Sequence, residues 1–396
     1  MELIIVIIVT GLFLLMLIIN IRASNQRQKQ TIDMITNSKE PTNEQIKTTT
    51  KLQVTKRIEF PYILDDYIGQ QLARSVLKLN LFNKKFSPVI YSKPGMGKSL
   101  LLELFCIERN RHLFAENQKN NINNRLGEIV RTEGGSLSLY NTAELVMCLE
   151  ENDILFIDEI HRMSMPIAER FLSVIQDKMM FGIDPRNFMT KAKELIRDKY
   201  LEGLMSGRIT KRGVLIDIQI PDSIMICGAT TELGMMPKPL LDRMFPIRLT
   251  NYSIEEMHEL VLKTYHKFQF EPHALDLIVT NSQFIPRLAK RMIVAINPEQ
   301  KNLKTITTSD IEQSLKFLEI YKGLSYTQRK YLSFIYSESP VGRKTISDYL
   351  GIALSELDNV VEPWLKENGW IKISSRGRSI TTIGKEFVDK ELLGII

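Results

Sequence analysis

The sequence predicts an α/β fold, in which a parallel sheet covered by helices is followed by a region made of helices. Apolar strand-like runs alternate with helical stretches from residue 57 onward, as in "FSPVIYS", "DILFID" and "DSIMICGATT". A loop rich in glycine joins the first of these runs to the helical stretch "LLLELFCIE". After about residue 250 the pattern is helical only, and residues 322–396 predict a small helix-rich domain that ends in a hairpin.

The composition is that of a globular protein. The chain has 396 residues, of which 44% are hydrophobic and 25% charged, and this excludes a disordered chain. The net charge of +6 favours an anionic partner, nucleic acid or lipid headgroups, although extra lysines on solvated faces explain it equally well. The cysteines Cys106, Cys148 and Cys227 fit neither a zinc pattern nor a disulfide framework, so we expect buried free thiols.

The N-terminus predicts a membrane anchor. Residues 3–21 are uncharged, and about 19 such residues suffice to cross a bilayer as a helix. Arg22, Arg27 and Lys29 follow the run, whereas only Glu2 and Met1 precede it. By the positive-inside rule we expect a single pass in the cell membrane, with the remainder of the chain in the cytoplasm. A cleaved signal peptide is the alternative, but the positive n-region that it requires is missing.

Residues 22–56 are predicted to be a flexible linker. They are rich in Asn, Gln, Thr, Ser and Lys and show no sustained helical period. A coil of this length has a root-mean-square reach of roughly 30 Å. We therefore expect the folded part to stand away from the membrane.

The loop "SKPGMGKS", residues 92–99, differs at one position from the phosphate-binding pattern G-x-x-x-x-G-K-[ST], because Ser92 replaces the first glycine. Gly95 and Gly97 allow backbone N–H groups to surround phosphate oxygens. Lys98 is expected to reach the β and γ phosphates, and the Ser99 hydroxyl to coordinate Mg²⁺. A serine at position 92 is tolerable provided that its φ is not strongly positive.

Two further motifs complete a predicted ATP-hydrolysing site. In "DILFIDEIHR", Asp158 is placed to hold the Mg²⁺ and its water, and Glu159 to polarise the attacking water. In "ICGATTELG", Thr230 and Thr231 end a strand that would lie beside the first two. Further on, Arg243 in "PLLDRM" and Arg287 in "FIPRLAKR" are arginines of the kind that stabilise transition-state charge.

These motifs, in this order, resemble the RuvB family of ring-forming AAA+ motors, and the resemblance runs from about residue 60 to the end. It implies a large ATPase domain at 57–250, a helical lid at 251–321 and a winged-helix DNA-binding domain at 322–396, after the anchor at 1–21. "LDDYIGQ" is similar to the segment that contacts the adenine. Thr231 matches sensor 1, Arg243 the arginine finger that reaches a neighbouring subunit, and Arg287 sensor 2. The residues that the resemblance places at the nucleotide are Tyr67, Ile68, Pro94, Gly95, Met96, Gly97, Lys98, Ser99, Leu100, Asp158 and Arg287.

The C-terminal segment also predicts DNA binding from its own residues. "RKTISDYLG" is expected to form one helix, and Ser355 with Asp358 to cap a second. "WIKISSRGRSITT" predicts two strands around an Arg-Gly-Arg tip. Lys372, Arg376 and Arg378 have no acid among them, which suits contacts with DNA phosphates, although a solvated hairpin tip is the alternative.

The sequence departs from the family at several positions. Ser92 replaces a glycine, Glu232 an arginine after "GATT", and Leu241 an arginine before the finger. The segment after Asp177 is about twenty residues longer than in the family, where this region docks the partner RuvA. Residues 190–205 have the apolar spacing of an inserted amphipathic helix. Docking of a RuvA-like partner is therefore in question.

The leading expectation is a membrane-anchored ATPase that uses ATP and Mg²⁺ and moves duplex or four-way-junction DNA through a homo-oligomeric ring, a hexamer by resemblance. One alternative is a nucleotide-gated tether that holds DNA or a partner at the membrane with slow hydrolysis. The other is a membrane AAA+ protein remodeller, although the chain has no H-E-x-x-H zinc motif to make it a protease.

Overall fold

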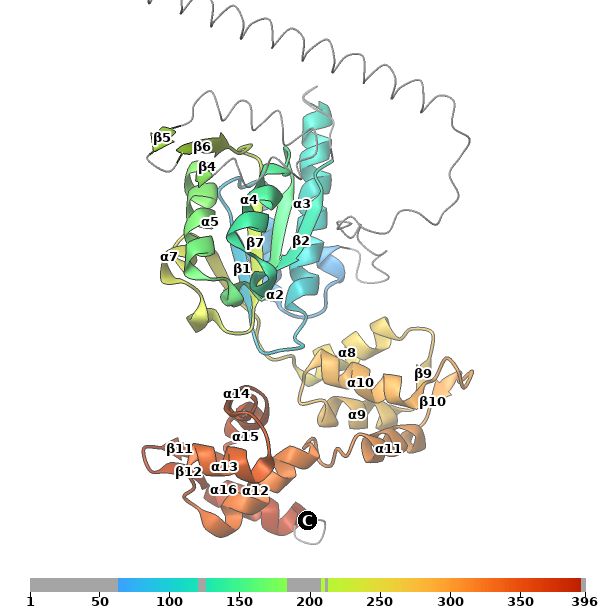
Figure 1. Cartoon of the computed structure of the whole chain (residues 1–396). Helices are drawn as coiled ribbons and strands as arrows, with labels where there is room; N and C mark the ends of the chain where they lie inside the picture. The colour runs from blue at the N-terminus through green and yellow to red at the C-terminus, as the bar shows by residue number, and fades with distance from the viewer. Residues whose placement is uncertain (1–62, 120–125, 184–207, 211–212, 393–396) are drawn as a thin grey trace, which may run out of the picture. The chain divides into compact units, whose positions relative to one another are not determined.

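The computed structural model describes residues 63–119, 126–183, 208–210 and 213–392 (Figure 1). The predicted anchor at 1–21, the linker at 22–56 and the amphipathic helix at 190–205 lie outside these ranges. Within them, no helix is both long enough and apolar enough to cross a membrane.

The centre of the large domain is the predicted parallel sheet. Its order is β2-β3-β7-β1-β8, and every neighbouring pair is parallel. The strands are β1 (Pro88–Tyr91), β2 (Ile129–Glu133), β3 (Ile154–Asp158), β7 (Met225–Thr230) and β8 (Phe245–Arg248). The central strands β3 and β7 are almost wholly apolar because both faces of a parallel sheet are covered by helices.

Alternate residues of these strands contribute to two separate cores, one on each face. Ile154 and Phe156 of β3 face the core that α2 (Gln71–Leu79) and α3 (Lys98–Lys119) cover. Leu155 and Ile157 face the opposite core, which contains residues of α4 (Leu139–Met147) and α5 (Met165–Asp177). The alternation is the two-residue period of a strand. Figure 1 shows the strands enclosed between these helices.

A second, antiparallel sheet follows α5, and the sequence did not predict it. It has the order β4-β6-β5, with β4 (Met179–Ile183), β5 (Arg208–Thr210) and β6 (Gly213–Gln219). Met180 of β4 and Ile218 of β6 are buried in the core beside α5. The strands on either side of residues 184–207, β4 and β5, thus belong to one small sheet.

After β8 the chain forms a helical domain, as predicted, with two short strands in addition. The helices are α8 (Ile254–Thr264), α9 (Pro272–Asn281), α10 (Pro286–Ile296) and α11 (Thr308–Phe317). The strands β9 (Gln269–Phe270) and β10 (Thr305–Ile306) are parallel. Ser253 with Glu256 and Thr307 with Asp310 form capping boxes, which fix where α8 and α11 begin.

The C-terminal domain has its own core. It contains α12 (Tyr326–Glu338), α13 (Arg343–Leu350), α14 (Leu354–Glu356), α15 (Glu362–Glu367), β11 (Ile371–Ser374), β12 (Gly377–Ile380) and α16 (Thr382–Phe387). Both tryptophans of the chain are here and are partly buried. Trp370 stacks on Phe387 with ring centroids 4.1 Å apart, and Trp364 lies 6.1 Å from the Phe284 ring.

Three predictions for this domain are tested by the structure. The helix over "RKTISDYLG" is confirmed as α13, which ends at Leu350 and is followed by Gly351 with φ +69°. The antiparallel pair β11–β12 is confirmed, although α16 follows it, so the hairpin does not end the chain. The predicted cap is wrong, because α14 begins after Ala353 without a side-chain cap. The Asp358 carboxylate instead pairs with Arg343 and Arg378, which are stronger partners than a backbone amide.

Candidate nucleotide-binding and hydrolysis site

The glycine-rich loop joins β1 to α3 and is shaped by two left-handed residues. Gly95 has φ +83° and Gly97 has φ +88°, values that residues with a Cβ rarely adopt. Ser92 is not among the residues with positive φ. Its hydroxyl donates to the Lys93 carbonyl at 3.1 Å. The backbone conformation at Ser92, where the usual pattern has its first glycine, therefore does not require a glycine.

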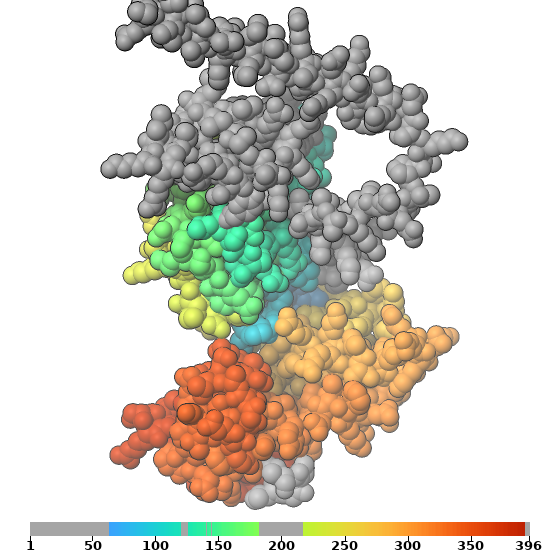
Figure 2. Space-filling model, in the orientation of Figure 1, coloured from blue at the N-terminus to red at the C-terminus, as the bar shows by residue number. Residues whose placement is uncertain are grey.

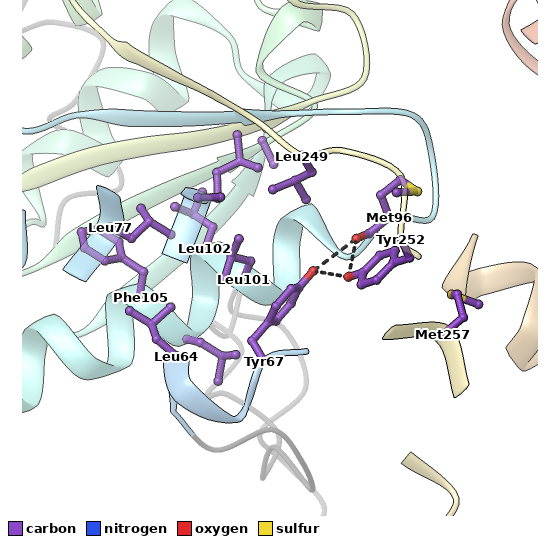
Figure 3. Close-up of a cluster of buried hydrophobic side chains, with 14 of the residues drawn as sticks. Leu64, Tyr67, Leu77, Met96, Leu101, Leu102, Phe105, Leu249, Tyr252 and Met257 are labelled. Atoms are coloured by element: carbon purple, nitrogen blue, oxygen red, sulfur yellow. Dashed lines mark hydrogen bonds between the residues drawn. The ribbon is translucent and has the colours of Figure 1, made fainter. Parts of the chain in front are cut away.

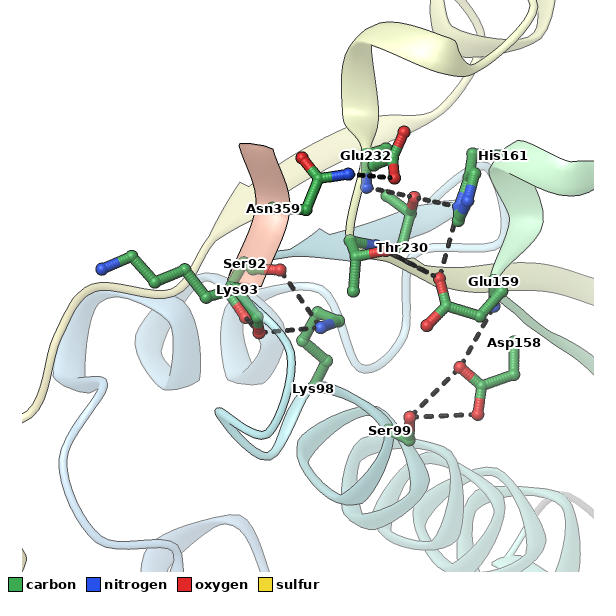
Figure 4. Close-up of polar contacts among 11 residues, drawn as sticks. Ser92, Lys93, Lys98, Ser99, Asp158, Glu159, His161, Thr230, Glu232 and Asn359 are labelled. Atoms are coloured by element: carbon green, nitrogen blue, oxygen red, sulfur yellow. Dashed lines mark hydrogen bonds and ion pairs between the residues drawn. The ribbon is translucent and has the colours of Figure 1, made fainter. Parts of the chain in front are cut away.

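Lys98 is directed at its own loop (Figure 4). Its Nζ donates to the carbonyls of Ser92 at 3.1 Å and Lys93 at 3.0 Å. Only 6% of the residue is exposed. Burial lowers the pKa of the Lys98 ammonium, and the carboxylates of Glu159 and Asp158 oppose that effect. An ammonium held between loop carbonyls in a partly desolvated site is well placed for a phosphate.

Ser99 and Asp158 meet across the ends of α3 and β3. The Ser99 Oγ donates to Asp158 Oδ1 at 3.2 Å and to Oδ2 at 3.1 Å. A hydroxyl and a carboxylate are the hard oxygen ligands that suit Mg²⁺, which also keeps waters and substrate phosphates as ligands. These two residues therefore fit the metal that the loop predicts.

Glu159 is held by the ends of two strands. Thr231 donates to its Oε2 from Oγ1 at 3.1 Å and from the backbone N at 3.4 Å. His161 Nδ1 lies 3.3 Å from the same oxygen and 2.9 Å from the Thr230 hydroxyl. Glu159 itself has φ +45°, a strained conformation that is found often at functional sites. The surrounding contacts fix the direction of one carboxylate that is 30% exposed.

The other end of the site is closed by two tyrosines (Figure 3). The Tyr67 hydroxyl donates to the Met96 carbonyl at 3.2 Å and accepts from Tyr252 at 3.0 Å. Burial raises the pKa of Tyr67 well above its usual range and that of Tyr252 to about 12. Both hydroxyls therefore stay protonated. A Cβ on Gly97 would lie 2.4 Å from the Tyr67 oxygen, so only glycine fits beneath this ring.

The lid contacts the loop directly. Arg287, in the first turn of α10, donates its backbone N–H to the Gly95 carbonyl at 3.3 Å. A Cβ on Gly95 would lie 2.8 Å from the Arg287 Cβ. The two segments are thus in close backbone contact, which requires a glycine at position 95.

A single cavity of about 620 Å³ joins these parts. Such a volume suits a nucleotide-sized ligand. Of the residues predicted for the site, the following line it: Tyr67, Ile68, Pro94, Gly95, Gly97, Lys98, Ser99, Leu100, Asp158, Glu159, Thr231 and Arg287. Met96 does not, since its side chain is buried in the core. Arg243 does not either: it is exposed, and its Nε donates to Gln176 Oε1 at 3.3 Å.

Sequence reasoning missed several residues of this cavity. Tyr252 and Tyr265 line it from the lid side, and Glu133 from the end of β2. Arg131 of β2, which is not among the lining residues, was missed as well, although its Nη2 lies 2.7 Å from Asp158 Oδ2. The only signal for Arg131 was a charged residue within the short run "IVRTE", which is too polar to predict a buried strand.

The three residues of the C-terminal hairpin that were predicted to contact DNA differ in their exposure. Lys372 and Arg376 are exposed, and the hairpin projects from the domain surface (Figure 2). Arg378 has no acid beside it in the hairpin sequence, but in the structure it contacts two acids from outside the hairpin. Its Nε lies 2.8 Å from Glu362 Oε1 and its Nη2 3.1 Å from Asp358 Oδ1, and its side chain is only 11% exposed. Arg378 neutralises a fully buried carboxylate.

Family comparisons agree with this architecture. The family model described as "Holliday junction DNA helicase RuvB P-loop domain" matches residues 60–184, and "RuvB C-terminal winged helix domain" matches residues 321–389. A "Holliday junction branch migration complex subunit RuvB" of Ehrlichia ruminantium (strain Gardel) is 30% identical over 346 residues, covering 84% of this chain and 92% of the relative. The chain belongs to the RuvB family.

Other RuvB proteins are similar over the same length. The subunit of the same name from Lactobacillus gasseri is 29% identical over 336 residues, which cover 81% of this chain and 88% of the relative. The solved structure of a mutant RuvB from Thermotoga maritima has a TM-score of 0.63 at 25% identity, covering 83% of this chain and 98% of that one. The resemblance therefore includes the ATPase, lid and winged-helix parts together.

One of the departures from RuvB has a visible contact. Glu232, in place of the arginine after "GATT", accepts a hydrogen bond at 3.2 Å from the Asn359 amide of the C-terminal domain (Figure 4). Its backbone N–H donates to the Thr230 hydroxyl at 3.0 Å. An arginine could not accept a hydrogen bond from the Asn359 amide, so the substitution changes which partners this loop can hold.

Proposed function

We propose that this RuvB-family protein is an ATP hydrolase that drives duplex DNA through a ring of identical subunits. The observation that supports this best is the meeting, in one cavity, of Lys98, the Ser99–Asp158 pair and the Glu159–Thr231 pair. A winged-helix domain with an exposed basic hairpin in the same chain supports DNA as the substrate.

Each side chain has a definite task in this proposal. The N–H groups of the loop and Lys98 hold the phosphates, and Ser99 and Asp158 hold Mg²⁺, which neutralises phosphate charge when bound. Glu159 orients the attacking water and receives its proton, while Thr231 fixes the carboxylate. Arg287 acts on the nucleotide of its own subunit and Arg243 on that of a neighbour. The exposed position of Arg243 suits a role at a subunit boundary.

The relatives' names indicate which DNA to test first, since they are subunits of a Holliday junction branch migration complex. We propose a four-way junction as the preferred substrate and a hexamer as the ring. Lys372 and Arg376 are the residues that we assign to phosphate contacts.

The test is ATP hydrolysis by the purified full-length protein, without DNA, with linear duplex and with four-way-junction DNA. Lys98→Ala is the blank. Stimulation by DNA, greatest with the junction, is the expected result. Hydrolysis that ignores DNA would contradict the DNA motor and favour a protein remodeller. No hydrolysis above the blank, with DNA still bound, would contradict the motor and favour a tether.

The tether is a second candidate because Glu232 and Leu241 stand where the family has arginines. A tether needs bound nucleotide but not turnover. Glu159→Gln therefore discriminates: a motor loses DNA movement in this variant, whereas a tether keeps its association with DNA and partner.

Residues 1–21 are proposed to anchor the protein in the cell membrane with the ATPase and DNA-binding domains in the cytoplasm. The proposal rests on the apolar run and on the positive charges that follow it. The full-length protein is expected to sediment with membranes and to resist extraction by high salt. Recovery of uncleaved protein in the soluble fraction would contradict the anchor.

Residues 190–205 are proposed to bind a partner in place of the family's RuvA-docking hairpin. The proposal rests on their apolar spacing and on their place between β4 and β5. Deleting them is expected to abolish association with that partner while basal ATP hydrolysis persists. Unchanged association would contradict it.

A further inference from the structure

Arg131 lies against the carboxylate assigned to the metal. Its Nη2 is 2.7 Å from Asp158 Oδ2, and its guanidinium lies 4.9 Å from the centre of the Phe156 ring. The register of β2 and β3 explains this position, because Arg131 is directly opposite Phe156 and Asp158 is two residues further along the same face. The side chain is 48% exposed, so it can move without disturbing a core.

The contacts of Asp158 leave little room for further partners. Ser99 donates to both carboxylate oxygens, and the Glu159 backbone N–H donates to Oδ1 at 3.1 Å. A carboxylate offers about four lone-pair sites in total. The direction that Arg131 takes on Oδ2 is therefore not available to a further partner. Its positive charge also opposes a divalent cation at the same group.

A second acceptor for Arg131 lies close by. Glu103, one turn after Ser99 on α3, places Oε2 3.8 Å from Arg131 Nη1. A small rotation of the guanidinium can strengthen this contact at the expense of Asp158. Arg131 thus has two alternative carboxylates, and one of them belongs to the metal site.

We propose that Arg131 is a positioning residue that competes with Mg²⁺ for Asp158 and moves to Glu103 when the metal binds. Arg131 then sets the Mg²⁺ concentration at which the nucleotide site is half-saturated with the metal. The inference rests on the proposed function, because it takes the cavity to be a nucleotide site.

The test is a Mg²⁺ titration of the full-length protein with a fluorescent ADP analogue, which follows binding rather than turnover. Arg131→Met is expected to lower the Mg²⁺ concentration of half-saturation on the order of fivefold, as loss of one partly exposed charge pair allows. Arg131→Lys keeps the charge and should remain near the unaltered protein. Arg111→Met removes an exposed arginine from α3 and serves as the matched control.

Glu103→Gln tests the second position. Without this acceptor Arg131 stays on Asp158, so the half-saturating Mg²⁺ concentration should rise. In an Arg131→Met background the same substitution should have no effect, because the residue that moves is gone. A general loss of stability would not make the effect of Glu103→Gln depend on the presence of Arg131.

Two results would overturn the inference. One is an unchanged or higher Mg²⁺ midpoint in Arg131→Met while the unaltered protein binds the nucleotide in a Mg²⁺-dependent manner. The other is an equal effect of Glu103→Gln with and without Arg131. Absence of nucleotide binding by the unaltered protein would instead overturn the proposed function, and the inference with it.

Discussion

At the scale of single residues, the Glu159 carboxylate is fixed in direction by Thr231 and His161 rather than by burial. A base that is oriented in this way acts on water without contributing to nucleotide affinity. We therefore expect Glu159→Gln to reduce ATP hydrolysis by about 10²- to 10⁴-fold, the usual contribution of a general base. Nucleotide binding should remain within a few-fold, as measured with a fluorescent analogue. Equal loss of binding and hydrolysis would contradict this role.

Substitutions at Gly97 and at Ser92, two positions of the same loop, are expected to differ in their effect on nucleotide affinity. Gly97→Ala forces a Cβ against the Tyr67 oxygen at a φ of +88°, so the loop must distort. The left-handed conformation alone costs about 1–2 kcal/mol for a residue with a Cβ. We expect nucleotide affinity to fall at least about tenfold. Ser92→Gly, which restores the family's glycine, should leave affinity near that of the unaltered protein because φ is not positive there. A large gain from Ser92→Gly would contradict this account.

Most residues of the site were predictable because their chemistry depends on residue types at fixed spacings. Lys98, Asp158 and Thr231 follow three strands of a parallel sheet, and the carboxyl ends of such strands meet at one edge. Arg131 and Tyr252 were not predictable in this way. Arg131 reaches Asp158 through strand register, and Tyr252 reaches the cavity through the folding of the lid. Neither position is expressed in a local spacing.

At the scale of elements, the hairpin β11–β12 contains two arginines with different roles. Arg378 neutralises Glu362, which is fully buried and also accepts from the Tyr331 hydroxyl at 3.0 Å. Arg378→Met leaves this carboxylate buried without a charged partner on its Oε1. We expect the C-terminal domain to lose about 3–5 kcal/mol of unfolding free energy, measured by denaturant titration.

Arg376 is the matched comparison, since it is exposed near the turn of the same hairpin. Arg376→Met should change stability by less than about 0.5 kcal/mol. It should weaken DNA binding and lower the slope of log affinity against log salt by about one, as loss of one phosphate contact does. An unchanged salt slope would exclude Arg376 from the DNA contact.

The strands that the sequence predicted are central in the parallel sheet, whereas the strands that it did not predict are at the edges. The runs ending at Tyr91, Asp158 and Thr230 are central strands, and their apolar character follows from burial on both faces. β2 and β8 are the edges, with partly exposed patterns such as "FPIR". Since edge strands are stabilised by pairing with a neighbour, their own residues need little apolar character.

At the scale of the whole molecule, the proposed role of the exposed Arg243 at a neighbour's nucleotide predicts an active site divided between subunits. Lys98→Ala and Arg243→Ala should each abolish hydrolysis when alone. In an equal mixture, about one interface in four joins an intact loop to an intact arginine in a head-to-tail ring. We expect measurable recovery of ATP hydrolysis after mixing. No recovery, with mixed rings demonstrated by pull-down, would place Arg243 outside the neighbour's site.

Both tryptophans of the chain lie in the C-terminal domain, one stacked on Phe387 and the other near Phe284 of the lid. The protein thus has an intrinsic optical reporter of its C-terminal domain and of the contact between that domain and the lid. Tryptophan fluorescence will therefore report on these surroundings even in the presence of the much larger ATPase domain. A spectral change on adding nucleotide would consequently show that nucleotide binding is transmitted to the C-terminal domain or to its contact with the lid.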